Sequence, residues 1–474
     1  MYQQLKINLD RKLKTPLAEQ IRLGIEQAII SGTLQQGDRL PSWIDLASQL
    51  GVSRGTVKVA YERLSDGQFI IASRSQGTRV AYQAVKPPST QDDYKNSSFT
   101  QMYLDMTTVQ GIFQLGVPSK EIFPAKLFSK IRSRSVRNES SGWPSYPDAR
   151  GEHGLRREIA AYLALSRGIQ CTPDQVFITS GFSGGLGLTL HVLGLGGKKA
   201  WVEDPGFPFS KHALEVGRLE ICPIPVDKDG IDVEFAMRNV PDASLALVTP
   251  GQQAPLGMSL SLTRRLKLLD WANQNGSWII EDDYLGELQL DGRAAPALFS
   301  LDTTGRVIHL GSFSKTISPK LRIGFAVVPF HMINHFAETT ATLVPAPSPS
   351  LQLSIQEFMH EGHFLRHLRR TKRTYSAQRD ELIKCLKRFN LETYTAGLSV
   401  LINLPPSLSD QKIVNEALAF NLAPSPLSLW YQDPKNAVSG LMLGVATSPL
   451  SKVNQSCENL VEIIEQNKVS HERI

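Results

Sequence analysis

Apolar residues recur at helical spacing near the start of the chain and outline one face of a helix. They are Leu17, Ile21, Ile25, Ala28 and Ile29, and this spacing predicts an amphipathic helix that ends at Ser31-Gly32. A second helix is expected to begin at Ser42, where Asp45 completes a capping box, and to stop at Gly51.

A third helix is predicted over SRGTVKVAYERL, with Ser53 as its cap. Its inward face would consist of Val57, Ala60, Tyr61 and Leu64. Two short helices joined through LGVS are typical of a helix-turn-helix, whose second helix enters the major groove of DNA. The stretch FIIASRSQGTRVAY then predicts two strands around a polar tip, which is a wing.

Polar and basic residues of this module are placed where phosphates and base edges would lie. The candidate DNA contacts are Ser53, Arg54, Thr56, Lys58, Arg74 and Arg79. The alternative is a three-helix packing or dimerisation unit whose cations form a solvated face. The clustering of cations at the start of the third helix and on the hairpin favours DNA binding.

Composition and charge support a small basic unit on a larger globular body. The chain has a net charge of +6 and is 41% hydrophobic, and residues 1–85 carry 11 Lys+Arg against 7 Asp+Glu. No apolar run is long enough to span a membrane, and the N-terminus has no signal-peptide pattern. The four cysteines form no CxxC pair, so we expect no disulfide frame and no metal site. These features favour a cytoplasmic protein.

The remaining sequence divides into a linker and a large domain. Residues 1–82 form the winged helix-turn-helix, and polar residues 83–110 predict a flexible linker. Residues 111–474 alternate short apolar runs with amphipathic stretches, which predicts an α/β domain with a mostly parallel sheet and a smaller C-terminal subdomain.

Five apolar runs of the large domain end in polar, glycine-bearing turns. The turns are TSGFSGG, EDPGFP, TPGQQAPLG, EDDYLGE and GSFSKT. Because ligands collect outside the carboxyl ends of strands in open α/β sheets, we expect the five turns to meet at one crevice. Each alone could be an ordinary loop, and the prediction rests on their joint content.

That content suits pyridoxal 5′-phosphate, which requires an amine, a carboxylate for its ring nitrogen and donors for its phosphate. Lys315 would supply the amine, Asp282 the carboxylate and Tyr284 a hydroxyl near the ring. Phe207 could stack on the ring or belong to the core. The phosphate-side candidates are Ser180, Gly181 and Ser183 at a helix start, the serines Ser312 and Ser314, and Arg322.

Two sets of motifs carry a resemblance to a known family. The segment SGTLQQGDRLPSWIDLASQLGVSRGTVKVAYERLSDGQFI is similar to the winged helix-turn-helix of GntR-type regulators. The motifs VEDPGFP, WIIEDDY and HLGSFSKTISPKLRIGFAVVP resemble, in order and spacing, the fold-type I aminotransferase domain of the MocR-type subgroup. The resemblance implies that Lys315 forms a Schiff base with the cofactor and that the protein is a head-to-tail homodimer.

The chain departs from the family pattern at three places. The turn TPGQQAPLG offers Gln252 and Gln253 where aminotransferases present an asparagine. SGLMLGVATSP has Leu441 and Met442 where many of them use an arginine to hold the substrate carboxylate. Trp43-Ile44 stands where GntR modules often have a basic residue.

These observations predict a DNA-binding transcription regulator that senses a small amine, amino acid or vitamer through its cofactor. We expect no net turnover, because the missing carboxylate clamp would weaken substrate positioning. The alternative function is a working aminotransferase with an accessory DNA-binding module.

Overall fold

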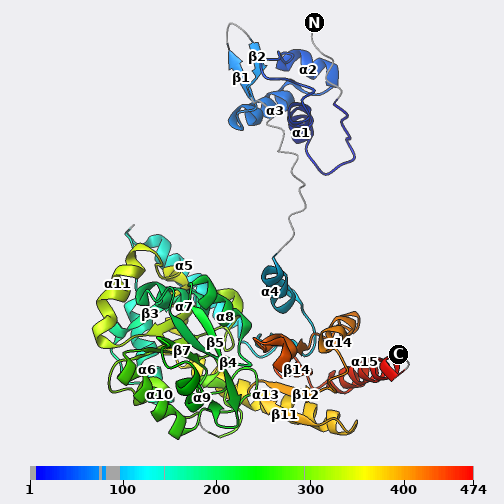
Figure 1. Ribbon diagram of the computed structural model, residues 1–474. Coiled ribbons are helices and arrows are strands. Elements are labelled where there is room, and N and C mark those ends of the chain that lie inside the picture. Colours follow the sequence, from blue (N-terminus) through cyan, green and yellow to red (C-terminus); the bar gives the residue numbers. More distant parts are fainter. Residues whose placement is uncertain (1–6, 74–76, 82–96, 144, 293, 473–474) are drawn as a thin grey trace. The chain divides into compact units, whose positions relative to one another are not determined.

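The computed structural model describes residues 7–73, 77–81, 97–143, 145–292 and 294–472. It divides the chain into two compact units, Met1–Ser97 and Ser98–Ile474 (Figure 1). We call the first unit the head and the second the body, and each is described by itself. None of the helices in the described ranges has the length and hydrophobicity that crossing a bilayer requires.

The head contains three helices and a two-stranded hairpin. Its elements are α1 (Leu17–Ile30), α2 (Trp43–Leu50), α3 (Arg54–Asp66), β1 (Ile70–Ser73) and β2 (Gly77–Val80). The predicted caps are confirmed: the Ser42 hydroxyl accepts from the Asp45 N–H and the Ser53 hydroxyl from the Thr56 N–H, both at 3.1 Å. Since these caps satisfy N–H groups that a helix start leaves unpaired, they fix where α2 and α3 begin.

The predicted inward face of α3 lies in the core of the head. Val57, Ala60 and Leu64 are fully buried there against Ile21, Ile25 and Ile29 of α1. β1 and β2 pair antiparallel from Ile70–Val80 to Ser73–Gly77, which gives the predicted wing. The hairpin tip, with Arg74, lies outside the described residues.

The prediction of an irregular linker through residue 110 is wrong in its last part. Helix α4 spans Ser98–Thr108 and belongs to the body. Phe99, Met102, Tyr103 and Met106 follow the spacing of one helix face. The ring of Phe99 stacks on His212 with centroids 3.6 Å apart, and Tyr103 lies 5.0 Å from Phe209. This aromatic contact holds the segment as a helix.

The body is built around an eight-stranded sheet with the order β3-β10-β9-β8-β7-β4-β5-β6. The strands are β3 (Val176–Thr179), β4 (Lys199–Asp204), β5 (Glu220–Asp227), β6 (Gly230–Ile231), β7 (Leu245–Val248), β8 (Trp278–Asp283), β9 (Val307–Ser312) and β10 (Gly324–Val327). Only β10 and β6 pair antiparallel with their neighbours. The sheet is therefore mostly parallel, as predicted.

Helices cover both faces of this sheet, because alternate strand residues are apolar on both sides (Figure 1). They are α5 (Ala125–Ser141), α6 (His153–Arg167), α7 (Gly181–Leu193), α8 (Pro208–Val216), α9 (Val233–Asn239), α10 (Leu262–Asn275), α11 (Ile333–Thr342) and α12 (Pro349–His360). Trp201 of β4 stacks on Trp271 of α10 with centroids 3.8 Å apart. Its neighbours Ala200 and Val202 pack on the opposite face with Leu214 of α8.

The predicted smaller subdomain is a four-stranded antiparallel sheet with the order β11-β12-β14-β13. Its elements are α13 (His363–Lys387), β11 (Thr393–Ala396), β12 (Ser399–Asn403), α14 (Asp410–Ala417), β13 (Ser425–Pro426), β14 (Gly440–Gly444) and α15 (Val453–Glu472). Leu441 and Leu443 of β14 point into the large core that includes α13 and α15, whereas Met442 belongs to a separate apolar cluster.

Residues 98–116 join the head to the rest of the body, and we call them the connecting segment. After α4 the backbone of Ile112 bonds Asn421 and Ala423, and the Phe113 carbonyl accepts from the Gly444 N–H at 2.7 Å. Backbone hydrogen bonds therefore hold the connecting segment against the four-stranded sheet of the small subdomain.

Candidate cofactor site and candidate DNA interface

The five turns predicted to meet follow strands that end at one edge of the main sheet. β4, β7, β8 and β9 are parallel, and β3 runs in the same direction because β3 and β9 both pair antiparallel with β10. In this register Thr179 and Ser312 stand on either side of Gly324. The carboxyl ends of such strands are where open α/β sheets bind ligands.

Lys315 lies in the turn after β9 and is half-buried. Its Nζ donates a hydrogen bond to the carbonyl oxygen of Gly116, 2.9 Å away. A Cβ atom on Gly116 would come within 2.9 Å of the same Nζ, and φ there is +77°, so glycine suits this position. Burial lowers the pKa of Lys315 to about 8, while nearby Asp282 opposes that shift. A larger share of this amine is neutral near pH 7 than for an exposed lysine.

Two of the three consecutive acids at the end of β8 have basic partners. A carboxylate oxygen of Glu281 lies 2.9 Å from His309 Nδ1. Although burial acts to lower the pKa of His309, the Glu281 carboxylate raises it overall. Asp283 accepts two hydrogen bonds from Arg167, at 2.7 and 3.1 Å, and both side chains are buried. These two acids are balanced within the body.

Asp282 is the third acid and is only 7% exposed. Among the described residues its carboxyl has no hydrogen-bond donor. Burial raises its pKa well above the usual range, the carboxylates of Asp283 and Glu203 add to that effect, and Lys315 opposes it. A buried carboxyl without a donor destabilises a fold unless a cation is supplied. The protonated ring nitrogen of pyridoxal phosphate is a group that would supply it.

The phosphate-side candidates gather at the start of α7. Ser180 precedes this helix without making a side-chain cap, and Ser183 lies exposed in its first turn. The guanidinium carbon of Arg322 is 3.7 Å from where a Cβ on Gly181 would lie. Among the described residues the guanidinium of Arg322 makes no hydrogen bond or ion pair, and only its backbone N–H is bonded, to the Pro319 carbonyl. A free guanidinium beside the uncapped N–H groups of a helix start suits a phosphate dianion.

Ser312 and Ser314 lie between this region and Lys315. The Ser312 hydroxyl bonds the Ser314 hydroxyl at 2.9 Å and accepts from the Ser314 N–H at 3.1 Å. The two serines therefore shape the turn that presents Lys315. The amine, the unpartnered acid and the unpaired guanidinium together fit pyridoxal phosphate.

Phe207 and Tyr284 are half-buried against one apolar cluster of the body. The cluster consists of Ala254, Ala396, Leu401, Leu427, Trp430 and Met442, with Met106, Leu115, Leu256 and Tyr431 at its margin. The ring of Phe207 lies 5.6 Å from Trp430 and 5.0 Å from Phe209. Phe207 thus connects this cluster to the aromatic contacts of α4.

The two glutamines of the TPGQQAPLG turn are buried. The Gln253 amide nitrogen donates to the carbonyl oxygens of Pro205 and Ala254, each at 2.8 Å, and its oxygen accepts from the Leu256 N–H at 2.9 Å. Gln253 therefore stabilises the turn. The side-chain oxygen of Gln252 points toward Gly397 of the small subdomain.

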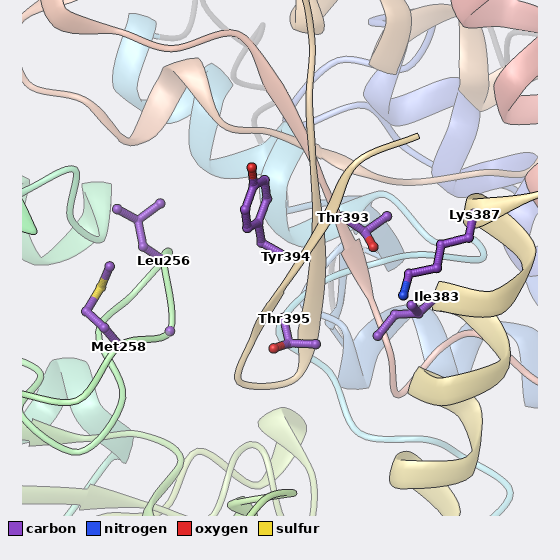
Figure 2. A pocket seen from close by; sticks show the side chains of 8 residues that line it. Leu256, Met258, Ile383, Lys387, Thr393, Tyr394 and Thr395 are labelled. Atoms are coloured by element: carbon purple, nitrogen blue, oxygen red, sulfur yellow. The ribbon is translucent and has the colours of Figure 1, made fainter. Parts of the chain in front are cut away.

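A groove of about 520 Å³ lies apart from these residues (Figure 2). It runs between the 256–258 turn and β11, and α13 closes it with Ile383 and Lys387. Its lining includes Leu256 but neither Lys315 nor Asp282. The candidate cofactor site is therefore defined by the polar groups at the edge of the main sheet, and this groove is not part of it.

The DNA-contact candidates of the head divide into three groups. Arg54 and Lys58 are exposed on α3, at its first residue and in its second turn. Ser53 and Thr56 bond each other through their hydroxyls at 2.8 Å and serve the helix cap. Arg79 donates to the Gly37 carbonyl at 2.7 Å, which directs part of its guanidinium into the head. Trp43 and Ile44, which stand where GntR modules often have a basic residue, are 40% and 43% exposed.

Three residues with a place in these sites were missed at the level of sequence. Arg39 forms a backbone bridge with Arg79, and its side chain lies against Gly77 of the wing. Gly116 bonds Lys315, which is 199 residues away in sequence. Arg167 bonds Asp283, which is 116 residues away. No local pattern marks contacts of such separation.

Comparison with known proteins matches both units. Residues 17–80 match the family described as bacterial regulatory proteins, gntR family, and residues 119–425 match aminotransferase class I and II. The probable rhizopine catabolism regulatory protein MocR of Rhizobium meliloti is 30% identical over 92% of each chain. The HTH-type pyridoxine biosynthesis transcriptional regulator PdxR of Corynebacterium glutamicum is 31% identical over 77% of each chain.

Solved structures agree with the architecture of the body. An archaeal alanine:glyoxylate aminotransferase superposes with a TM-score of 0.71 at 24% identity, covering 78% of this chain and 96% of its own. That likeness establishes the aminotransferase fold. With a GntR head preceding such a body, the chain belongs to the MocR-type subfamily of GntR transcription regulators.

Proposed function

We propose that this regulator holds pyridoxal phosphate at the sheet edge and that a small molecule bound there changes how its head engages double-stranded operator DNA. Lys315 would bind the cofactor covalently, Asp282 would face its ring nitrogen, and Arg322 with the start of α7 would hold its phosphate. Bound there, the cofactor supplies an aldehyde carbon that reacts reversibly with amines. Tyr284 and Phe207 would border its ring.

The observation that carries the proposal is the contact between the connecting segment and this site. Gly116 accepts the Lys315 hydrogen bond, and Met106 of α4 packs at the margin of the same cluster as Phe207. Any change in what Lys315 bonds acts directly on the backbone that leads to the head. Coupling of this kind requires that the ligand favour one arrangement of the segment over another.

Transamination with net turnover is a weaker candidate. The amine and the acid that it needs are present, but β14 offers buried Leu441 and Met442 in place of a carboxylate-binding arginine. Supplying amino acids with a keto acid and counting product molecules per protein tests this alternative. We expect less than one turnover.

We further propose a head-to-tail homodimer that acts in the cytoplasm, where its DNA partner is. Trp143 is 91% and Tyr146 100% exposed in the single chain. Large apolar rings that are exposed at a surface favour an interface with another chain, which would bury them. Sedimentation of the full-length protein with and without an operator duplex tests the dimer.

Comparing operator affinity with and without pyridoxal phosphate tests the regulatory proposal.

A further inference from the structure

The side of the cofactor site formed by the small subdomain is apolar. Successive side chains of a strand point to opposite faces of its sheet. In β14, Leu441 and Leu443 enter the core under the small sheet, and Met442 points to the other face, where it joins Leu401 of β12. Met442 is 1% exposed. On this second face Met442 shares a cluster with Phe207, Ala254 and Tyr284, which lie in the turns after strands of the main sheet.

Met442 and the cofactor candidates share one cluster. Phe207 and Tyr284 pack against the residues that surround Met442, and Leu115 does so next to the Gly116 carbonyl that bonds Lys315. The segment that ends at Gly116 also bonds Gly444, two residues beyond Met442. A molecule attached near Lys315 would therefore extend its body toward Met442.

The cations around this cluster already have assigned partners or lie elsewhere. Lys211 Nζ lies 3.1 Å from Asp204 and 2.8 Å from the Trp430 carbonyl, and its side chain is 7% exposed. Arg167 is bonded to Asp283, and Arg322 stands at the start of α7. Lys211 and Arg167 are thus taken by acids of the body, and Arg322 lies with the phosphate-side candidates.

We propose that the ligand of this site is a primary amine with an apolar body and no carboxylate next to the amine. The inference rests on the proposed function, since it requires the cofactor. An amine would bind through the cofactor's aldehyde carbon, its hydrocarbon chain would face the apolar cluster of Met442, Leu401 and Trp430, and no charge would have to be buried. An α-amino acid of the same chain would bury a carboxylate without a partner, which is costly.

The test compares 3-methylbutylamine with L-leucine, which has the same carbon chain and amine plus a carboxylate. Full-length protein loaded with pyridoxal phosphate is titrated with each compound, following the visible absorbance of the cofactor and the heat of binding. We expect the amine to half-saturate the change at a concentration at least about 10-fold lower than leucine. Met442→Leu should keep this ratio, and Met442→Arg should bring the two compounds to similar concentrations or favour leucine.

Three results would overturn the inference while the cofactor absorbance is intact: leucine acts as well as the amine, neither compound acts, or a folded Met442→Arg protein keeps the wild-type ratio. The first would occur if a second subunit supplied the cation. Absence of visible absorbance, with no cofactor trapped on Lys315 by borohydride, refutes the proposed function itself and this inference with it. The wild-type comparison decides if Met442→Arg does not fold.

Discussion

The amine of Lys315 and the carbonyl of Gly116 are 2.9 Å apart, although 199 residues separate them in sequence. The hydrogen bond joins the amine that we propose binds the cofactor to the segment that leads to the head. Gly116 can occupy this place because it lacks a side chain and has a positive φ. A group that occupies the Lys315 nitrogen therefore competes with a structural contact of the connecting segment.

Replacing Lys315 by alanine should abolish covalent cofactor binding. The variant removes the amine that would react with the aldehyde, so the visible absorbance and the borohydride-trapped adduct should both disappear. Mass spectrometry of the reduced protein provides the measurement. Lys320→Ala is the matched control, because Lys320 is exposed in the same segment. A trapped adduct that persists in the Lys315 variant would contradict the assignment.

The rate of cofactor attachment should depend on pH with a midpoint near 8. Only the neutral amine attacks an aldehyde, and burial lowers the pKa of Lys315 to about 8. The neutral form is therefore lost as pH falls below 8, and the rate should drop about tenfold per pH unit there and level off above it. Stopped-flow mixing of cofactor-free protein with pyridoxal phosphate measures this. Nα-acetyl-lysine, the control, should show a midpoint near the ordinary lysine pKa, and a protein midpoint equal to it would refute the prediction.

Replacing Tyr103 by alanine should uncouple the cofactor from DNA binding. The substitution removes the ring that lies 5.0 Å from Phe209, which in turn contacts Phe207. Cofactor absorbance should stay unchanged, while the difference in operator affinity between cofactor-loaded and cofactor-free protein should shrink. Gln101→Ala, on the exposed side of α4, is the control. Equal affinity differences in wild-type and Tyr103→Ala proteins would argue against transmission through α4.

Replacing Arg54 by alanine should weaken operator binding and lessen its dependence on salt. Arg54 is exposed at the first residue of α3, where one lost phosphate contact should reduce the slope of log affinity against log salt by about 1. Fluorescence anisotropy with a duplex selected from a random library measures both quantities. Arg63→Ala is the control, because Arg63 is in the last turn of α3 and bonds Glu19 at 2.8 Å. Equal slopes for Arg54→Ala and the wild type would remove Arg54 from the interface.

Replacing Arg167 by alanine should destabilise the body by about 3–5 kcal/mol, because it leaves the buried Asp283 carboxylate without its partner. Thermal and urea unfolding provide the measurement. Arg157→Ala on the same helix should cost less than about 0.5 kcal/mol, since that side chain is 60% exposed. Similar losses of unfolding free energy for both variants would show that the Arg167–Asp283 pair does not stabilise the body more than an exposed arginine does.

Local signals explain what could be predicted from the sequence. The hydroxyls of Ser42 and Ser53 each bond an N–H three residues later, so the start of a helix can be predicted from four consecutive residues. Apolar runs likewise predict the strands after which the polar turns come. Helix α4 was missed although Phe99, Met102, Tyr103 and Met106 have helical spacing. The polar residues before it suggested a linker, and the partners that stabilise it, Phe209 and His212, lie more than 100 residues away.

The sequence singles out candidate residues for the site but not the contacts that distinguish them. Lys315 and Asp282 stand out because each follows an apolar run of the sequence, but their difference from neighbouring residues depends on tertiary contacts. Glu281, Asp282 and Asp283 are equivalent in sequence, and only the positions of His309 and Arg167 show which acid remains without a donor. Pairing across the fold determines which of several similar residues is available.

The head has a hydrophobic core formed by its own residues, from Ile21 of α1 to Val80 of β2. Its stability therefore does not require the apolar interior of the body, and the two units can diverge separately. A chimera joined at Ser97–Ser98 with the head of another family member should keep its ligand response and acquire new promoters. The same arrangement allows one body to serve different genes through exchange of roughly a fifth of the chain.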